Sequence, residues 1–478
     1  MSTNNGGPVR KDFAVFDCDA HVNDPRAIWS EYLEPEYRDA VRHAYWQEDN
    51  QTILNGRSVV IGGQAHDFST YNPICIAGPR MNKKLLRKLQ QTGLSPEQKQ
   101  YLEHRGAYDP HARIRDMDLM GIDQVMIIPT MMVAHYPYVE NIHAAHGFAR
   151  AYNNWVSDFC KQVPDRLYPA GWLPLQSPEY TSQELHRIAK LGFSVALIRP
   201  IDARGRYPNL IFPGPRNGTL TNTMDKVFRT FEDTGIVCGM HTFPALPSEP
   251  SELAVSVGEV IAAAGSMELG GKMVDPQTLS FVFEAMVWLA QVLLSGFLDM
   301  YPRLKMAIFE SNASWLPEML EHCDRLFKLY ANERLIKSDR LPSEAFAQQC
   351  YIAFESDEEP VFQLWDCFEN IGVWSSDAYH HDGSDSWSAI RYMDEAGVPK
   401  NTQAKLLGGN ARRMYGIEGK IFVTEEVTDV PRPDWFPKQA DIEQWAAAES
   451  DPRAHGITQS IDFSKLDPRM IMAAIRVY

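Results

Sequence analysis

Short runs of apolar residues recur along the chain, and each run ends in polar or turn-forming residues. Longer stretches with helical periodicity separate these runs. Near-continuous runs of Val, Ile, Leu, Met and Phe are typical of parallel strands that are buried on both faces. We therefore predict eight strands, at residues 13–19, 123–130, 166–175, 192–200, 235–243, 303–311, 349–356 and 370–382.

The alternation of these strands with helix-like stretches predicts a fold of the α/β class. Eight strand–helix units in succession are typical of a (β/α)₈ TIM barrel. A doubly wound parallel sheet is the alternative. It is less favoured because no G-x-G-x-x-G pattern and no phosphate-binding loop follows any early strand.

Three long segments interrupt the repeating pattern. Residues 26–110 follow the first strand, residues 243–278 follow the fifth, and residues 419–478 follow the last unit. We expect a barrel over residues 13–418, including both insertions, and a C-terminal extension over 419–478. Long insertions on the loops after strands usually build lids, substrate walls or subunit contacts, and the extension favours a homodimer.

Composition narrows the classes of partner. The chain has 478 residues, 44% of them hydrophobic, and a formal charge of −16 without a basic block, which argues against nucleic acid and membrane partners. The most apolar stretch, residues 279–300, contains Glu284 and Asp299, so we predict a buried helix there. The beginning of the sequence shows no secretory pattern, and the seven cysteines never form C-x-x-C. We expect a cytoplasmic protein with reduced thiols.

Potential metal ligands follow several of the predicted strands. The first strand ends in Asp19 and His21, which share a face because side chains alternate along a strand. The C-terminal ends of all strands in a parallel barrel meet at one rim, where the active site lies. Histidine and carboxylate donors at that rim favour a divalent-metal site. The later strands place there Arg199, His241, Glu310, Glu355 and Asp377, with His380 just beyond.

Some of these donors also have a structural interpretation. Asp17 shares the face of Asp19 and His21 but lies deeper, so it either orients the ligands or binds the metal itself. A single histidine at a strand end, such as His241, is more often hydrogen-bonded than metal-bound. Glu310 could cap the following helix. Metal binding is favoured for it because a charge directly after a buried run is costly without a partner.

The substrate contacts are less determined by the sequence. Arg199 either binds a substrate carboxylate or forms a salt bridge with an acidic residue at the rim. Glu355 either contacts the substrate or the metal, or forms a surface ion pair. Aromatic residues near the same rim predict an apolar, partly aromatic pocket, with Trp315, Trp374 and Tyr379 as the candidates.

Several motifs together resemble one protein family. They are D-x-H at 19–21, HTF at 241–243, MYPRLKMAIFESNASWLP at 300–317 and SSDAYHHD at 375–382. MDLMGIDQVMIIPT at 117–130 and LLGGNARRMYGI at 406–417 are similar to the family's second-strand unit and closing helix. These segments resemble the amidohydrolase superfamily, and within it the amidohydrolase-2 branch, which contains aminocarboxymuconate-semialdehyde-decarboxylase-like enzymes. The resemblance covers roughly residues 13–418.

The resemblance implies a barrel enzyme with a catalytic divalent metal. By matching position, the ligands would be Asp19, His21, His241 and Asp377. Asp377 would also move a proton, with His380 as a second catalytic candidate. Branch members often have histidine at the positions of Asp19 and Glu310. Carboxylates there favour Fe or Mn over a histidine-rich Zn site, and Glu310 could hold or bridge a second metal.

We therefore expect one or two divalent ions (Zn, Fe or Mn), no nucleotide cofactor and a small-molecule substrate. The leading interpretation is hydrolysis or non-oxidative decarboxylation of a small cyclic or aromatic carboxylic acid or amide. The alternative is a non-haem diiron monooxygenase on the same barrel, which would hydroxylate an apolar substrate. A non-catalytic barrel is disfavoured because the set of ligands is intact.

Overall fold

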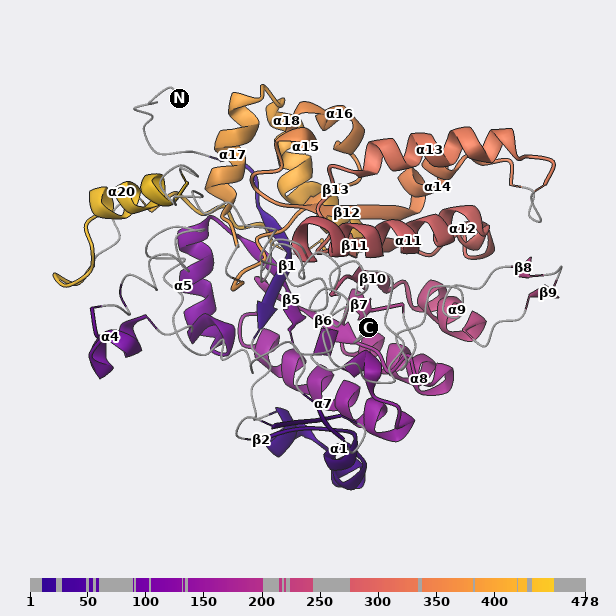
Figure 1. Cartoon of the computed structure of the whole chain (residues 1–478), viewed down its shortest axis with the longest axis horizontal. Coiled ribbons are helices and arrows are strands. Elements are labelled where there is room, and N and C mark those ends of the chain that lie inside the picture. Colours follow the sequence, from indigo (N-terminus) through magenta and orange to yellow (C-terminus); the bar gives the residue numbers. More distant parts are fainter. Residues whose placement is uncertain are drawn as a thin grey trace, which may run out of the picture.

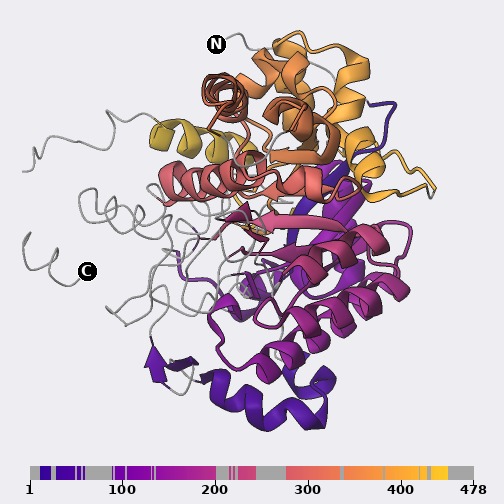
Figure 2. The same ribbon diagram turned by 90° about the vertical axis from the view of Figure 1, so that its right-hand side faces the viewer.

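The structure is a computed structural model, and Figures 1 and 2 show it from two directions. It describes residues 11–22, 28–48, 51–54, 57–59, 89, 92–102, 105–130, 132–133, 136–200, 215–216, 219–220, 224–243, 276–333, 338–380, 383–418, 420–427 and 432–450. Of the predicted insertion at 243–278, the stretch 244–275 lies outside this part of the chain, as do all of residues 60–88 and the end of the chain after 450.

Eight parallel strands form one sheet in which sequence neighbours are also neighbours in space. A parallel bridge joins Ala20 of the first strand to Ala378, in the segment that follows the last strand, so the sheet closes on itself. This order confirms the (β/α)₈ barrel and excludes the doubly wound sheet. The strands are β1 (Phe16–Val22), β5 (Gln124–Pro129), β6 (Leu167–Trp172), β7 (Val195–Ile198), β10 (Val237–His241), β11 (Met306–Phe309), β12 (Cys350–Phe354) and β13 (Gly372–Trp374).

Seven of these strands are buried along their whole length, and in β6 only two residues are partly exposed. One face of each strand fills the barrel interior and the other packs against the outer helices, which explains why the strands read as continuous apolar runs. Seven of the predicted strand segments therefore contain a shorter observed strand, whereas the first, predicted at 13–19, only overlaps β1, which begins and ends three residues later.

Helices surround the barrel (Figure 1). Several begin at a side-chain cap: Asp109, Asn141, Ser177 and Asp385 accept hydrogen bonds from N–H groups in the first turn. The helices around the strands are α5 (Pro110–Met120), α7 (Ile142–Lys161), α8 (Pro178–Lys190), α9 (Asp225–Thr234), α11 (Phe281–Leu294), α12 (Phe297–Met300), α13 (Leu316–Leu329), α14 (Pro342–Gln349), α15 (Glu359–Gln363), α16 (Trp365–Phe368), α17 (Ser386–Glu395), α18 (Lys400–Ala404) and α19 (Asn410–Tyr415).

The first insertion adds structure on one side of the barrel. Helix α1 (Arg38–Ala44) leads into an antiparallel sheet of β2 (Tyr45–Glu48), β3 (Gln51–Leu54) and β4 (Arg57–Val59), which lies beyond α7 (Figures 1 and 2). A smaller antiparallel pair is formed by β8 (Pro215–Arg216) and β9 (Thr219–Leu220).

The C-terminal extension contains helix α20 (Gln439–Ser450), and the first insertion also contains α4 (Pro96–Tyr101). Phe436 and Ile442 of the extension form a small buried cluster with Leu89 and Leu102 of the insertion. The described part of the C-terminal extension therefore packs against the first insertion of the same chain. In the described residues, no helix combines the length and apolar character needed to span a membrane. The predicted core helix at 279–300 is present as α11 and α12.

Candidate metal centre

The end of β1 brings Asp19 and His21 together in the buried rim of the barrel. Residues 17 to 20 of β1 stand opposite only 125 to 127 of β5, so β1 carries a bulge between Asp17 and Ala20. Bulges change the direction of side chains near active sites. His21 Nε2 lies 3.2 Å from Asp19 Oδ1, and both residues are at most 3% exposed.

The two histidines of the strand ends present the same nitrogen to this centre. His21 Nδ1 lies 3.1 Å from the carbonyl of Pro129, and His241 Nδ1 lies 2.6 Å from the carbonyl of Thr242. A carbonyl can only accept, so in both rings Nδ1–H donates and Nε2 keeps its lone pair. Burial lowers the pKa of His241 to about 4, which maintains the neutral imidazole that binds metals. His241 Nε2 lies 3.7 Å from Asp19 Oδ2.

Asp377 connects these donors to His380. Asp377 Oδ1 lies 3.5 Å from His21 Nε2 and 2.7 Å from His380 Nδ1. The rings of His21 and His380 stack with their centroids 4.1 Å apart. The backbone N–H of Asp377 donates to the carbonyl of Asp19 at 3.0 Å, so barrel closure itself sets the position of this carboxylate.

Glu310 completes the group from the end of β11. Asp19, His21, His241 and Glu310 each offer a ligand atom within 4.8 Å of the others, and so do His21, Glu310, Asp377 and His380. Histidine and carboxylate ligands in such a group suit a divalent cation. The five donors predicted from sequence are therefore brought together.

Backbone strain accompanies two of these donors. Glu310 has φ 54° and Asp377 has φ 50°, in the left-handed region, and Asn312 beside them has φ 53°. Such conformations cost about 1–3 kcal/mol each in non-glycine residues and persist where the surrounding structure enforces them. The hydroxyl of Thr242 donates to the backbone carbonyl of Glu310 and helps to hold it.

The charge state of the centre also fits a cation. Among the described residues, Asp19 Oδ1 and His241 Nε2 are buried without a hydrogen-bond partner. Burial raises the pKa of Asp19, because a carboxylate shielded from water is costly unless a positive charge lies beside it. A bound divalent cation would supply that charge, so the residues present fit the metal.

Asp17 lies deeper and is engaged with the protein. Its carboxylate accepts hydrogen bonds from the backbone N–H and the hydroxyl of Ser376, at 3.0 and 2.5 Å. It also accepts one from the N–H of Asp19 at 3.2 Å. Burial raises the pKa of Asp17 to about 7. Of the two interpretations open from sequence, these contacts favour orientation of β1 and the end of β13.

Arg199 and Glu355 have protein partners near the rim. Arg199 Nη2 donates to Glu284 Oε1 of α11 at 2.9 Å, and both side chains are fully buried. Asn312 Nδ2 lies 3.5 Å from Glu355 Oε1. Substrate binding by either residue stays a prediction.

The predicted aromatic candidates make protein contacts through their polar atoms. Trp374 Nε1 donates to Ser356 Oγ, Trp315 Nε1 donates to the carbonyl of Ser311, and the hydroxyl of Tyr379 donates to Asp116. Trp374 is fully buried, whereas Trp315 is partly exposed. Their roles in a substrate pocket stay predictions.

Sequence reasoning missed Glu284, Thr242 and Ser376, which hold or orient the residues of the rim. The importance of Glu284 could have been recognised from the sequence, because a lone acidic residue in a strongly apolar helix requires a buried partner. The hydroxyl residues had none, because serine and threonine are common at strand ends for many reasons.

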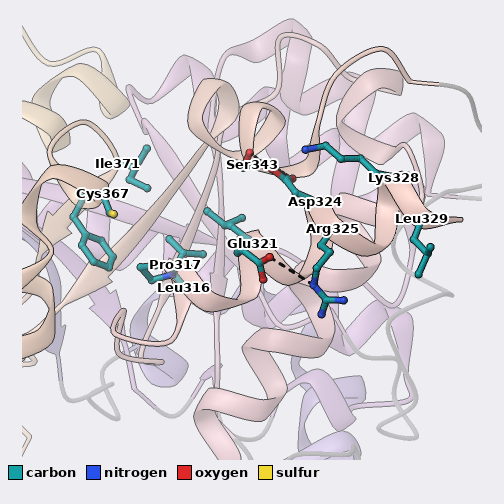
Figure 3. Close-up of a pocket in the computed structure, with 12 residues that line it drawn as sticks. Leu316, Pro317, Glu321, Asp324, Arg325, Lys328, Leu329, Ser343, Cys367 and Ile371 are labelled. Atoms are coloured by element: carbon teal, nitrogen blue, oxygen red, sulfur yellow. Dashed lines mark hydrogen bonds and ion pairs between the residues drawn. The ribbon is translucent and has the colours of Figure 1, made fainter. Parts of the chain in front are cut away.

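A large cavity of about 1030 Å³ lies elsewhere, on the outer surface of the barrel. It runs along α13, from Leu316 to Leu329, and faces Cys367 and Ile371 across the groove (Figure 3). Glu321 and Arg325, which both line it, form an ion pair with a distance of 3.6 Å between Oε1 and Nε. None of the metal donors lines it.

Comparison with known proteins gives one family and several solved structures of the same fold. The Amidohydro_2 family model, described as amidohydrolase, matches residues 16–417. No curated protein sequence matches the chain. An amidohydrolase structure from Mycobacterium avium subsp. paratuberculosis K-10 is 16% identical with a TM-score of 0.59, covering 85% of this chain and 100% of that one.

Two decarboxylase structures are similar at the same level. The 5-carboxyvanillate decarboxylase of Novosphingobium aromaticivorans DSM 12444, complexed with manganese and 4-hydroxy-3-methoxy-5-nitrobenzoic acid, is 17% identical with a TM-score of 0.55, covering 85% of this chain and 97% of that one. The dihydroxybenzoic acid decarboxylase of Polaromonas sp. JS666, with bound manganese and the inhibitor 2-nitroresorcinol, is 16% identical with a TM-score of 0.53, covering 85% and 98%. At these identities the similarity shows the fold.

Proposed function

The chain belongs to the amidohydrolase family, in its amidohydrolase-2 branch, and we propose that it is a metal-dependent decarboxylase of a small aromatic or cyclic carboxylic acid. The observation that carries the proposal is the convergence of buried histidine and carboxylate donors at the C-terminal rim of the barrel. Two similar structures are decarboxylases of aromatic acids that hold manganese, which supports both the reaction class and the metal.

The proposed ligands are Asp19, His21, His241, Glu310 and Asp377. When bound, a divalent cation supplies positive charge that orients an anionic substrate and stabilises negative charge in the transition state. His21 and His241 hold their Nε2 atoms toward it through the hydrogen bonds of Nδ1 to Pro129 and Thr242. Asp17 fixes the strand beneath them through Ser376.

Asp377 and His380 are proposed to handle the proton. Decarboxylation breaks the bond between the ring carbon and the carboxylate, CO₂ leaves, and the electron pair that remains on the ring carbon takes up a proton. His380 Nδ1 lies 2.7 Å from Asp377 Oδ1, so a proton held between them can be delivered from either group. No electron acceptor is needed, because the reaction is not an oxidation.

Hydrolysis of an amide uses the same proton-transfer pair and is the second reaction class. In that case Asp377 would take a proton from an attacking water molecule rather than give one to carbon. The monooxygenase alternative gains no support from the family or from the structures compared above.

A paired panel of substrates tests the proposal. Purified protein supplied with Mn²⁺ is incubated with hydroxybenzoic acids and with the corresponding amides, and CO₂ and ammonia are both measured. The proposal predicts CO₂ from at least one acid and the decarboxylated ring as the product. Release of ammonia from the amides without CO₂ from any acid would refute decarboxylation and would identify the protein as a hydrolase.

A further inference from the structure

We infer that Arg199, held by Glu284, is the receptor for a second anionic group of the substrate, one that remains on the product; this inference rests on the proposed function. Arg199 directly follows the last residue of β7. Ile198 pairs with Met240 in the neighbouring strand, so the next position along that register places Arg199 beside His241. The guanidinium therefore belongs to the same rim as the metal donors.

Most of the hydrogen-bonding capacity of Arg199 is unused. The residue is 1% exposed, and its Nη2 donates to Glu284 Oε1 at 2.9 Å. Among the residues that the structure describes, its Nε and Nη1 atoms are buried and have no hydrogen-bond partner. Guanidinium N–H groups are strong donors, and leaving them unsatisfied away from water costs free energy. A carboxylate or phenolate oxygen is the complementary acceptor.

A buried arginine at the opposite end of the barrel shows the contrast. Arg166 stands just before β6, and all three of its nitrogens are engaged. Nε and Nη2 donate to the carbonyls of Asp123 and Ile122, and Nη1 donates to Asp118, at 2.7 to 2.8 Å. All three side-chain nitrogens of Arg166 are thus satisfied within the protein, whereas only one of those of Arg199 is bonded to a described residue.

Glu284 positions the guanidinium group of Arg199 but does not accept hydrogen bonds from all of its N–H groups. Its Oε1 accepts from Arg199, while its Oε2 accepts from the backbone N–H of Phe243 at 3.2 Å. Phe243 lies two residues after His241, so this contact joins α11 to the loop that leaves the metal centre. The face of Tyr138 lies against the guanidinium, 5.8 Å from the ring centroid.

The chemistry of decarboxylation decides which substrate group this arginine can bind. The leaving carboxylate loses its negative charge as CO₂ forms, so an arginine on that group would stabilise the substrate more than the transition state. A group that keeps its charge is held equally in both states. The substrate class that follows is an aromatic or cyclic acid with a second carboxylate or a phenolate.

Binding of two probes tests the receptor without turnover. Benzoate and isophthalate (benzene-1,3-dicarboxylate) are titrated into the full-length, metal-loaded protein by calorimetry. We expect isophthalate to bind about 10- to 100-fold more tightly than benzoate, the scale of a charged hydrogen-bonded pair. Arg199→Met should abolish that preference. Arg166→Met is the control, which should lower the melting temperature but keep the preference.

The outcomes separate the receptor from the reaction. If wild-type protein does not prefer isophthalate, or if Arg199→Met keeps both its metal and the preference, the receptor is refuted. If the preference for isophthalate depends on Arg199 but no acid is decarboxylated, the assignment of Arg199 as the receptor is supported and the proposed decarboxylation is refuted. Should Arg199→Met fail to fold, Arg199→Lys retains the charge but loses the planar fork. Its preference should fall at least severalfold, and an unchanged preference would refute the receptor.

Discussion

At the scale of single residues, one carboxylate joins the metal donors to the proton-transfer pair. Asp377 lies 3.5 Å from His21 Nε2 and 2.7 Å from His380 Nδ1, on a strained backbone that barrel closure holds in place. The same side chain is therefore expected both to bind the cation and to exchange a proton with the substrate.

The substitution Asp377→Asn separates these two roles. An amide keeps the shape and one coordinating oxygen but cannot carry the proton. We expect the variant to retain much of its metal and to lose on the order of 10² or more in kcat, the usual scale of general acid–base catalysis. Steady-state kinetics and metal analysis check this, with the exposed Asp366→Asn as control. Turnover near that of wild type would show that Asp377 does not move the proton.

His21→Ala and His241→Ala test the metal site directly. Each removes one Nε2 that faces the centre, and each should lose most of the bound metal while the barrel stays folded. His186→Ala on α8 is the control, because its Nδ1 is bonded within the helix to Ser182. Elemental analysis and circular dichroism provide the readout. Full metal content in both variants would overturn the ligand assignment.

Glu310 decides how many cations the centre holds. His21 belongs to both groups of donors, but its Nε2 has one lone pair and can bind one cation only. We therefore expect about one ion per chain, because His21 cannot bind a cation in both groups of donors at once. Glu310→His should leave that number unchanged, because histidine is also a good ligand. A drop from about two ions to about one in this variant would instead show that Glu310 bridges a pair.

The sequence predicted the donors of the rim better than their neighbours. The convergence of Asp19, His21, His241, Glu310 and Asp377 could be predicted because the C-terminal ends of parallel strands meet at one rim, and their role as metal ligands stays a prediction. The sequence indicated that Glu284 needs a buried partner but not that the partner is Arg199, because the rotation of its helix about its own axis depends on packing across the whole barrel. The bulge in β1 was also invisible, because all seven residues of that strand are buried and alternation carries no information there.

At the scale of elements, the first insertion is fastened to the barrel by an ion pair. Arg150 of α7 donates through Nε and Nη2 to the two carboxylate oxygens of Glu34, at 2.8 and 2.6 Å. These hydrogen bonds lower the pKa of Glu34 below its ordinary value. Both side chains remain partly exposed, so the contribution to stability is modest.

Glu34→Gln should therefore weaken the protein in a pH-dependent way. A carboxyl group with a lowered pKa stabilises the fold above its unfolded-state pKa, and this stabilisation is lost as the pH falls through the folded-state value. We expect a loss of about 0.5–1 kcal/mol in unfolding free energy at neutral pH and a smaller loss at about pH 3, because the pH has then fallen from the ordinary pKa of glutamate, about 4.3, toward the lowered folded-state value. Denaturant titrations at both pH values check this, with the exposed Glu31→Gln as control. A difference that is undiminished at low pH would contradict the ion-pair account.

At the scale of the whole molecule, the division of the chain stays a proposal: a barrel over 13–418 and an extension over 419–478. The alternation of strands and helices predicted the barrel because every β/α unit has the same burial pattern. The extension and the insertion share a small cluster built by Phe436, Ile442, Leu89 and Leu102, which no periodicity in sequence could reveal. A homodimer and a cytoplasmic location stay predictions.

The most direct test of the central claim is the amount of CO₂ released per molecule of aromatic acid consumed, measured without oxygen before and after removal of the metal. The account predicts one CO₂ for each acid consumed in an oxygen-free solution, since decarboxylation is not an oxidation. It also predicts loss of the reaction after chelation and recovery on addition of Mn²⁺. Consumption of the acid that requires oxygen, or that continues unchanged after all metal has been removed, would contradict it.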